Sequence, residues 1–124
     1  MRDAAERRKA YRSGIRAEWI ALCWLRLKTY RILACRYIVK GGEIDIVARR
    51  GDTIAFIEVK ARAHLDEARI AIDAVKERRL SRAARVWLGA NPWASSLTLR
   101  GDALYIAPWC WPRHSIAAIE LDLG

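Results

Sequence analysis

The stretch that decides the fold is GGEIDIVARRGDTIAFIEVK, which occupies residues 41–60. Two runs rich in β-branched residues flank Gly51 and Asp52, and a two-residue loop that begins with glycine suits the tight turn of a β-hairpin. Pairing across this loop puts Glu43 opposite Lys60, Asp45 opposite Glu58 and Val47 opposite Phe56 on one face, and Ile44 opposite Val59, Ile46 opposite Ile57 and Ala48 opposite Ala55 on the other. One face is therefore apolar, whereas the other carries Lys60 and three carboxylates, two of which, those of Asp45 and Glu58, lie directly opposite each other.

The opposed carboxylates of Asp45 and Glu58 need an explanation. Directly opposed residues have Cβ atoms about 4.5–5.5 Å apart, and like charges at that distance destabilise the pair. Burial would raise the pKa of one carboxyl group unless a cation lay nearby. A divalent metal held by oxygen ligands would remove the conflict. The alternative is the solvated polar face of an ordinary half-exposed hairpin, and spacing alone does not separate the two.

Length and charge limit the classes of protein to consider. The 124 residues and 14.2 kDa fit one domain, which we place at residues 14–124 after a basic, flexible arm at residues 1–13. The net charge of +9 favours an anionic partner, most often nucleic acid and next an acidic membrane surface. No apolar run reaches the roughly 18 residues of a membrane span, and the charged start does not form a secretory signal. We therefore expect a cytoplasmic protein that does not cross a membrane.

The three cysteines, Cys23, Cys35 and Cys110, are odd in number and widely spaced. They form neither a CxxC metal-binding pair nor a disulfide framework. Because free cysteine behaves as a small apolar residue, we expect each of them to be buried.

Hydrophobic periodicity and turn signals predict the remaining elements. We expect a helix at residues 13–28 and strands at residues 30–39, 97–106 (as one strand or two) and 116–123. Asp73 would cap a second helix that runs to about residue 88. Short connections make the first three strands antiparallel neighbours. These elements predict an α/β fold with a central mixed sheet of about five strands flanked by helices.

The first helix carries a glutamate on its apolar side. Its expected inward stripe consists of Ile15, Trp19, Leu22, Cys23 and Leu25, and Glu18 lies on the same stripe. Buried carboxylates are paired or bind metal. Glu18 is therefore either part of a site or a residue at the edge of the stripe that reaches water or an arginine.

The second helix is rich in cations, and the chain as a whole is rich in tryptophan. The cations on the polar side of the helix are Lys76, Arg78, Arg79, Arg82 and Arg85. They form either a solvated face or a stripe that contacts phosphates. The six tryptophans, including Trp109 and Trp111 in an expected loop at residues 108–112, could stack on bases. Packing in a core or an interface is the role we expect for most of them.

The order of helix, strand, hairpin and helix, with Asp45 on one strand and Glu58-Val59-Lys60 on the next, resembles the PD-(D/E)xK nuclease superfamily. More narrowly, the chain resembles the YraN-like family, which is related in fold to archaeal Holliday-junction resolvases. The match covers residues 14–106 and is carried by Gly42, Glu43, Ile44, Asp45, Phe56, Ile57, Glu58, Val59, Lys60 and Arg62, with Gly14, Glu18, Ala21 and Leu25 upstream and Lys76, Leu80, Ala84 and Leu88 downstream. Thr29 stands where the family usually has glycine, and Arg36 stands where it usually has asparagine.

The resemblance implies a restriction-endonuclease-like core and a role for each matching residue. Asp45, Glu58 and the main-chain carbonyl of Val59 would bind Mg²⁺, or Mn²⁺ in its place. Lys60 would orient the attacking water or stabilise the charge that develops on the phosphate, and Glu18 would complete the outer shell of the metal. The cations expected to hold the nucleic-acid backbone are Arg62, Lys76, Arg79 and Arg82.

Three functions fit these observations. The first is a Mg²⁺-dependent endonuclease that hydrolyses phosphodiester bonds in DNA, with branched or flapped structures among its candidate substrates. The second is a nucleic-acid-binding module that keeps the nuclease fold with little or no activity. The third is a basic adaptor that binds an acidic protein. Junction resolvases of similar fold act as dimers, so a homodimer is expected by analogy.

Overall fold

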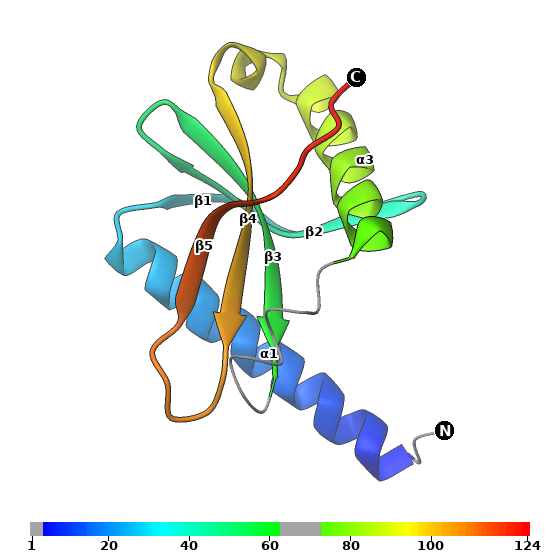
Figure 1. Ribbon diagram of the computed structural model, residues 1–124, viewed down its shortest axis with the longest axis vertical. Helices are drawn as coiled ribbons and strands as arrows, with labels where there is room; N and C mark the ends of the chain where they lie inside the picture. Colours follow the sequence, from blue (N-terminus) through cyan, green and yellow to red (C-terminus); the bar gives the residue numbers. More distant parts are fainter. Residues whose placement is uncertain (1–3, 63–72) are drawn as a thin grey trace.

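The protein is built around one five-stranded sheet with a helix on each face (Figure 1). The computed structural model describes the backbone of residues 4–62 and 73–124, and the side chains of residues 14–62 and 73–124. The elements are α1 (Ala4–Leu27), β1 (Arg31–Val39), β2 (Gly42–Arg50), β3 (Thr53–Ala61), α3 (Ala74–Ala90), the short 3-10 helix η1 (Pro92–Ser96), β4 (Thr98–Ile106) and β5 (Arg113–Ile119). The strand order is β1-β2-β3-β4-β5, in which β3 and β4 are parallel and the other neighbours are antiparallel. The predicted α/β fold with a mixed sheet is confirmed.

Helices α1 and α3 cover opposite faces of the sheet. Successive residues of a strand point to opposite faces, and β3 follows this rule. Ala55 and Ile57 pack in the cluster beneath α1, whereas Ile54 and Phe56 pack in the cluster beneath α3. The sheet therefore has a separate apolar core on each side, which is the layered arrangement that a helix stripe and a sheet face form together.

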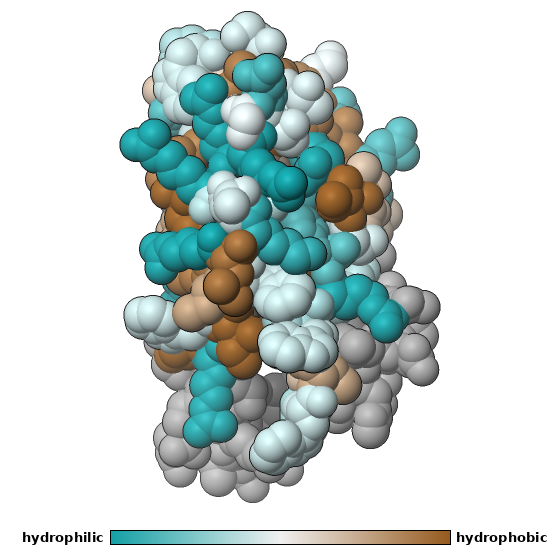
Figure 2. All heavy atoms as spheres, turned by 90° about the vertical axis from the view of Figure 1, so that its left-hand side faces the viewer, coloured by the Kyte–Doolittle hydropathy of each residue, from teal (hydrophilic) through white to brown (hydrophobic). Residues whose placement is uncertain are grey.

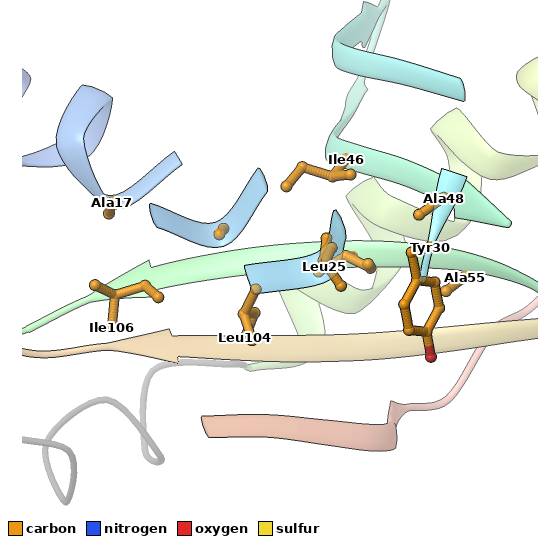
Figure 3. Close-up of a cluster of buried hydrophobic side chains, with 10 residues drawn as sticks. Ala17, Leu25, Tyr30, Ile46, Ala48, Ala55, Leu104 and Ile106 are labelled. Atoms are coloured by element: carbon orange, nitrogen blue, oxygen red, sulfur yellow. The ribbon is translucent and has the colours of Figure 1, made fainter. Parts of the chain in front are cut away.

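The inward face of α1 differs from the stripe that periodicity predicted. Among the described side chains of α1, those of residues 14–27, the buried positions are Ala17, Ala21 and Leu25, and Figure 3 shows Ala17 and Leu25 facing the strands. Trp19 is 63% exposed and Cys23 is also exposed, so their assignment to the inward stripe was wrong. Small alanines let the helix lie close to the sheet, and a larger side chain at those positions would hold it away.

Other expected core residues are at the surface as well. All three cysteines are free and exposed, which contradicts the prediction that they are buried. Trp87 is buried at 4% exposure, but the exposed large apolar side chains include Trp19, Trp93, Trp109 and Trp111. Core packing is therefore not the role of most of the tryptophans.

The β2–β3 ladder keeps the predicted register only near its turn. Its pairs run from the turn to Ile46 and Ile57, as the sequence predicted. Beyond them Ile44 lies in the cluster beneath α3, whereas Val59 packs against the cluster beneath α1. The predicted pairs Glu43–Lys60, Ile44–Val59 and Asp45–Glu58 are not ladder partners and were wrong. The physical reason is that β2 turns away from β3 and stays paired with β1 (Figure 1).

Two non-glycine residues adopt left-handed backbone conformations around β1. Thr29 has φ of 70° and follows the last turn of α1, where the N–H of Thr29 bonds to the carbonyl of Arg26 and the N–H of Tyr30 to that of Leu25. This pair of bonds is a Schellman motif, which usually has glycine at the left-handed position. Arg36 has φ of 49°. Both are positions where the related family usually has a residue that tolerates this conformation.

A buried polar cluster joins the start of β1 to β4 and β5. Asp102 is completely buried. Its carboxylate accepts hydrogen bonds from the Arg100 guanidinium at 2.8 Å and from the Ala117 N–H at 3.0 Å. His114 Nε2 lies 2.7 Å from Asp102 Oδ2. Arg100 also donates to the Tyr30 hydroxyl at 2.7 Å, which points away from the core beside β4 (Figure 3). Burial alone would raise the pKa of Asp102, but its hydrogen bonds with His114, Arg100 and Ala117 hold that pKa below the ordinary value.

α1 begins at Ala4 and not near residue 13, so its backbone includes most of the segment expected to be a separate arm. The side chains of residues 1–13 lie outside the described residues, and contact of this segment with phosphate stays a prediction. Hydrophilic side chains cross the face shown in Figure 2, with apolar residues in small separate groups between them. Among the described residues, no helix has the length and apolar character needed to span a membrane.

Candidate active site

β2 and β3 separate at the end of their ladder, and the side chain of Asp45 occupies the opening. Asp45 Oδ2 accepts a hydrogen bond from the backbone N–H of Val59 at 2.7 Å. In a continuous antiparallel ladder this N–H would bond to the backbone of β2, so the carboxylate replaces a main-chain acceptor. The N–H and carbonyl of one strand residue point to the same side. The Val59 carbonyl therefore faces this opening too.

The surroundings of Asp45 oppose its ionisation. Burial raises the pKa of Asp45 from 3.8 to about 7; the negative charge of Glu58 adds to this effect, Glu18 and Glu43 add less, and the Val59 N–H opposes it. Carboxylates on α1, β2 and β3 thus all contribute to the electrostatic environment of Asp45. The electrostatic conflict that the sequence predicted between Asp45 and Glu58 is present, although the two residues are not ladder partners.

Two lysines lie close to the carboxylate of Glu58. Lys60 Nζ is 3.0 Å from Glu58 Oε1, and Nζ of Lys76, in the first turn of α3, is 3.7 Å from the same oxygen. Lys60 is only 5% exposed. Its burial lowers its pKa below the ordinary value of 10.5, Lys76 lowers that pKa further, and Glu58 opposes the shift. Lys60 therefore releases a proton more readily than an exposed lysine does.

Glu18 on α1 forms an ion pair with an arginine of β1. Its Oε2 lies 2.7 Å from Nε of Arg36 on β1, in an ion pair in which both side chains are partly exposed. The negative charge of Glu18 still acts on Asp45. Both alternatives for Glu18 therefore hold in part: its carboxylate contacts an arginine, and its charge acts on Asp45 in the predicted site.

A hollow of about 340 Å³ opens beside Glu58. Its lining residues are Glu43, Glu58, Asp73, Val75, Lys76 and Arg79. The predicted cap of α3 is confirmed, since Asp73 Oδ1 accepts from the Lys76 N–H at 3.0 Å. The sequence predicted only the capping role for Asp73, and for Glu43 a place on the charged face of the hairpin and in the motif of the resembling family. Their place in the hollow depends on how α3 packs against β2, which no local pattern reports.

Two of the predicted nucleic-acid-binding arginines lie away from the hollow. Arg62 follows the end of β3, where its N–H bonds to the carbonyl of Ile106 at 3.1 Å and its guanidinium to the carbonyl of Ala61 at 2.7 Å. Arg82 is exposed, and its Nε donates to the carbonyl of Lys40 at the β1–β2 turn. Of the four predicted cations, Lys76 and Arg79 line the hollow itself.

Comparison with known proteins identifies the relatives of this chain. The family described as "Uncharacterised protein family UPF0102" matches residues 17–118. The chain belongs to the UPF0102 family. It is 58% identical over 124 residues to a UPF0102 protein of Methylocella silvestris, a match that covers 100% of both chains. It is 56% identical over 120 residues to a UPF0102 protein of Methylobacterium nodulans, covering 96% of this chain and 93% of the relative. The predicted membership of the YraN-like family is confirmed.

The donor atoms at the opening of this UPF0102 chain suit a small, hard cation. Asp45 and Glu58 supply carboxylate oxygens and Val59 a main-chain oxygen, which are ligand types that Mg²⁺ accepts. Among the described residues, no three His, Cys, Asp or Glu side chains are grouped so that they could hold a metal ion by themselves. This arrangement is compatible with Mg²⁺, which commonly takes one or two carboxylates and completes its shell with water and substrate phosphate.

Proposed function

We propose that this UPF0102 protein is a Mg²⁺-dependent endonuclease that hydrolyses phosphodiester bonds in DNA. The observation that supports it most is the meeting of Asp45, Glu58 and the buried Lys60 where β2 and β3 separate. Because the pKa of Asp45 is raised to about 7, ionisation of Asp45 lowers the stability of the folded protein unless a cation lies nearby. Perturbed titrating groups in such a cluster are typical of functional sites.

Each residue has a part in this proposal. Asp45, Glu58 and the Val59 carbonyl would hold Mg²⁺, which when bound polarises a phosphodiester and lowers the pKa of a bound water. Lys60, with its lowered pKa, would orient the attacking water or stabilise charge on the phosphate oxygens. Glu18 would act on the outer shell while Arg36 holds its carboxylate in place.

The cations near the site would bind the DNA backbone. Lys76 and Arg79 line the hollow beside Glu58, and Arg62 follows the strand that carries Glu58 and Lys60. We assign Arg82 a weaker role, because its Nε is engaged with the β1–β2 turn. A protein that neutralises several phosphates in this way loses affinity steeply as salt concentration rises.

The test is a panel of end-labelled linear, flapped and four-way DNA substrates with Mg²⁺ or Mn²⁺, and with EDTA as the control. Asp45→Ala and Lys60→Met should lower the cleavage rate at least about 100-fold while the affinity for DNA stays within a few-fold. Methionine keeps the length of the buried Lys60 side chain, and Asp52→Ala at the exposed turn serves as the matched control. Metal-dependent cleavage that persists in both variants would refute the assignment of the site.

A second candidate is a nucleic-acid-binding module with little or no activity. It is favoured by the engagement of Glu58 with Lys60 and Lys76, which already neutralises one of the two carboxylates. Salt-dependent DNA binding without cleavage under any metal would select it. Affinity for an acidic protein with none for DNA would select the adaptor instead. A cytoplasmic location and a homodimer remain part of the proposal, and sedimentation velocity tests the latter.

A further inference from the structure

The connection between β4 and β5 holds two tryptophans whose side chains lie largely outside the core. Trp109 is 103% exposed and Trp111 is 80% exposed. Trp109 also has φ of 61°, a conformation that a bulky L-residue adopts at an energetic cost. An exposed indole on a left-handed backbone contributes little to the stability of the fold. Strain of this kind is a reason to look for a function in binding.

This connection lies at the same end of the sheet as the candidate active site. β3 and β4 are parallel, with Lys60 level with Tyr105 and Ala61 level with Ile106. Both strands therefore end together, and the β4–β5 connection extends beyond their ends (Figure 1). The chain from Tyr105 to Trp109 can span at most about 14 Å. Because Tyr105 is the ladder partner of Lys60, Trp109 lies no more than about 14 Å along the strand direction from Lys60.

The indole of Trp111 belongs to an aromatic and cationic surface that reaches α1, and Trp109 lies two residues before it in the chain. The ring of Trp111 packs against that of Trp24, with centroids 5.8 Å apart and planes tilted by 37°. Lys28 Nζ lies 5.0 Å from the centroid of the Trp24 ring. Because Trp111 is 80% exposed and Trp109 fully so, faces of both rings are open to a ligand. The cations at this end include the exposed Arg62 and Arg113, which follow β3 and begin β5.

We propose that Trp109 and Trp111 form a stacking surface for unpaired nucleotide bases, so that the preferred substrates carry single-stranded DNA next to the cleaved bond. The inference rests on the nuclease function proposed above. Aromatic rings beside cations bind single strands, because bases stack on the rings while the cations contact the phosphates. The net charge of +9 favours this polyanion over a second copy of the same cationic chain.

The experiment measures fluorescence anisotropy of a labelled 20-nucleotide single strand and a blunt duplex of the same sequence, in EDTA so that binding is separated from cleavage. Wild type is compared with a Trp109→Leu/Trp111→Leu variant and a Trp109→Phe/Trp111→Phe variant. Leucine keeps apolar bulk without a ring, and phenylalanine keeps a ring. The matched control is Trp93→Leu, since Trp93 is 48% exposed and lies in η1, before the opposite end of β4.

The leucine variant should bind the single strand at least about tenfold more weakly while its duplex affinity changes less than about twofold. The phenylalanine variant should keep most of the single-strand affinity, and the control variant all of it. An equal loss for both DNAs, no loss for either, or a change from dimer to monomer in sedimentation velocity would overturn the inference. Wild type that binds neither DNA would instead refute the proposed nuclease function. If wild type binds both DNAs and the leucine and phenylalanine variants bind them with the same affinity, only the stacking surface is refuted.

Discussion

Replacing Asp45 with asparagine should make the protein more stable at pH 8 and leave its stability almost unchanged at pH 4. Asparagine has the shape of aspartate and still offers an oxygen to the Val59 N–H, but it carries no charge. Burial and the neighbouring carboxylates raise the pKa of Asp45 from 3.8 in the unfolded chain to about 7. The folded state therefore retains a proton that the unfolded state has lost, and stability falls as the pH rises from about 4 to about 7.

The size of the effect follows from the same two values. One pKa unit corresponds to about 1.36 kcal/mol, so the difference between 3.8 and about 7 corresponds to roughly 4 kcal/mol at full ionisation. Asp45 is partly exposed, and water that reaches its carboxylate reduces this figure. We expect the asparagine variant to exceed wild type by about 2–4 kcal/mol in the free energy of unfolding at pH 8.

Urea denaturation of both proteins at pH 4 and pH 8, in EDTA, measures the difference. Glu43→Gln is the control, because Glu43 is exposed and contributes least among the causes that raise the pKa of Asp45. Adding Mg²⁺ at pH 8 should then stabilise wild type but not Asp45→Asn, by about 2.7 kcal/mol at a concentration 100 times the dissociation constant. A gain that is the same at both pH values, or a variant less stable than wild type at pH 8, would refute the electrostatic reasoning.

Three further substitutions test a left-handed backbone conformation, a buried ion pair and a close helix–strand contact, each by urea denaturation. Thr29→Gly should stabilise the protein by about 1 kcal/mol, because glycine removes the cost of φ at 70° but loses more entropy on folding; Thr29→Ala, which keeps a Cβ, should not. Asp102→Asn should destabilise by about 3–5 kcal/mol, because it leaves the Arg100 guanidinium without its buried carboxylate. Gly42→Ala should destabilise by about 1–3 kcal/mol, since a Cβ there would overlap the carbonyl oxygen of Arg79, whereas Gly14→Ala on α1 meets no neighbour and should not.

The parts of the fold that local patterns specify could be predicted from the sequence. The hairpin register from the turn to Ile46 and Ile57 follows from loop length and alternation, and both act within a few residues. The cap at Asp73 follows from the chemistry of a helix start. The electrostatic conflict between Asp45 and Glu58 was also predictable, because it follows from like charges on two adjoining strands.

The geometry beyond the hairpin could not be predicted in this way. The separation of β2 from β3 at Asp45 results from how β2 follows β1, which is a property of the whole sheet. The inward face of α1 was misassigned because large residues such as Trp19 outweigh alanines in a hydrophobic pattern, whereas close packing on a sheet favours Ala17 and Ala21. Asp102 and His114 gave no signal, since their contact brings together residues from two strands.

The hydrogen bond between Asp45 and Val59 turns one backbone amide into a natural probe of the site. The proton of that amide points at the carboxylate whose ionisation is in question. Its ¹⁵N and ¹H chemical shifts should therefore titrate with an apparent midpoint near pH 7, where most amides of the sheet stay constant. A single assigned NMR cross-peak would then report the charge at the site, with no labelled substrate and no change in the sequence.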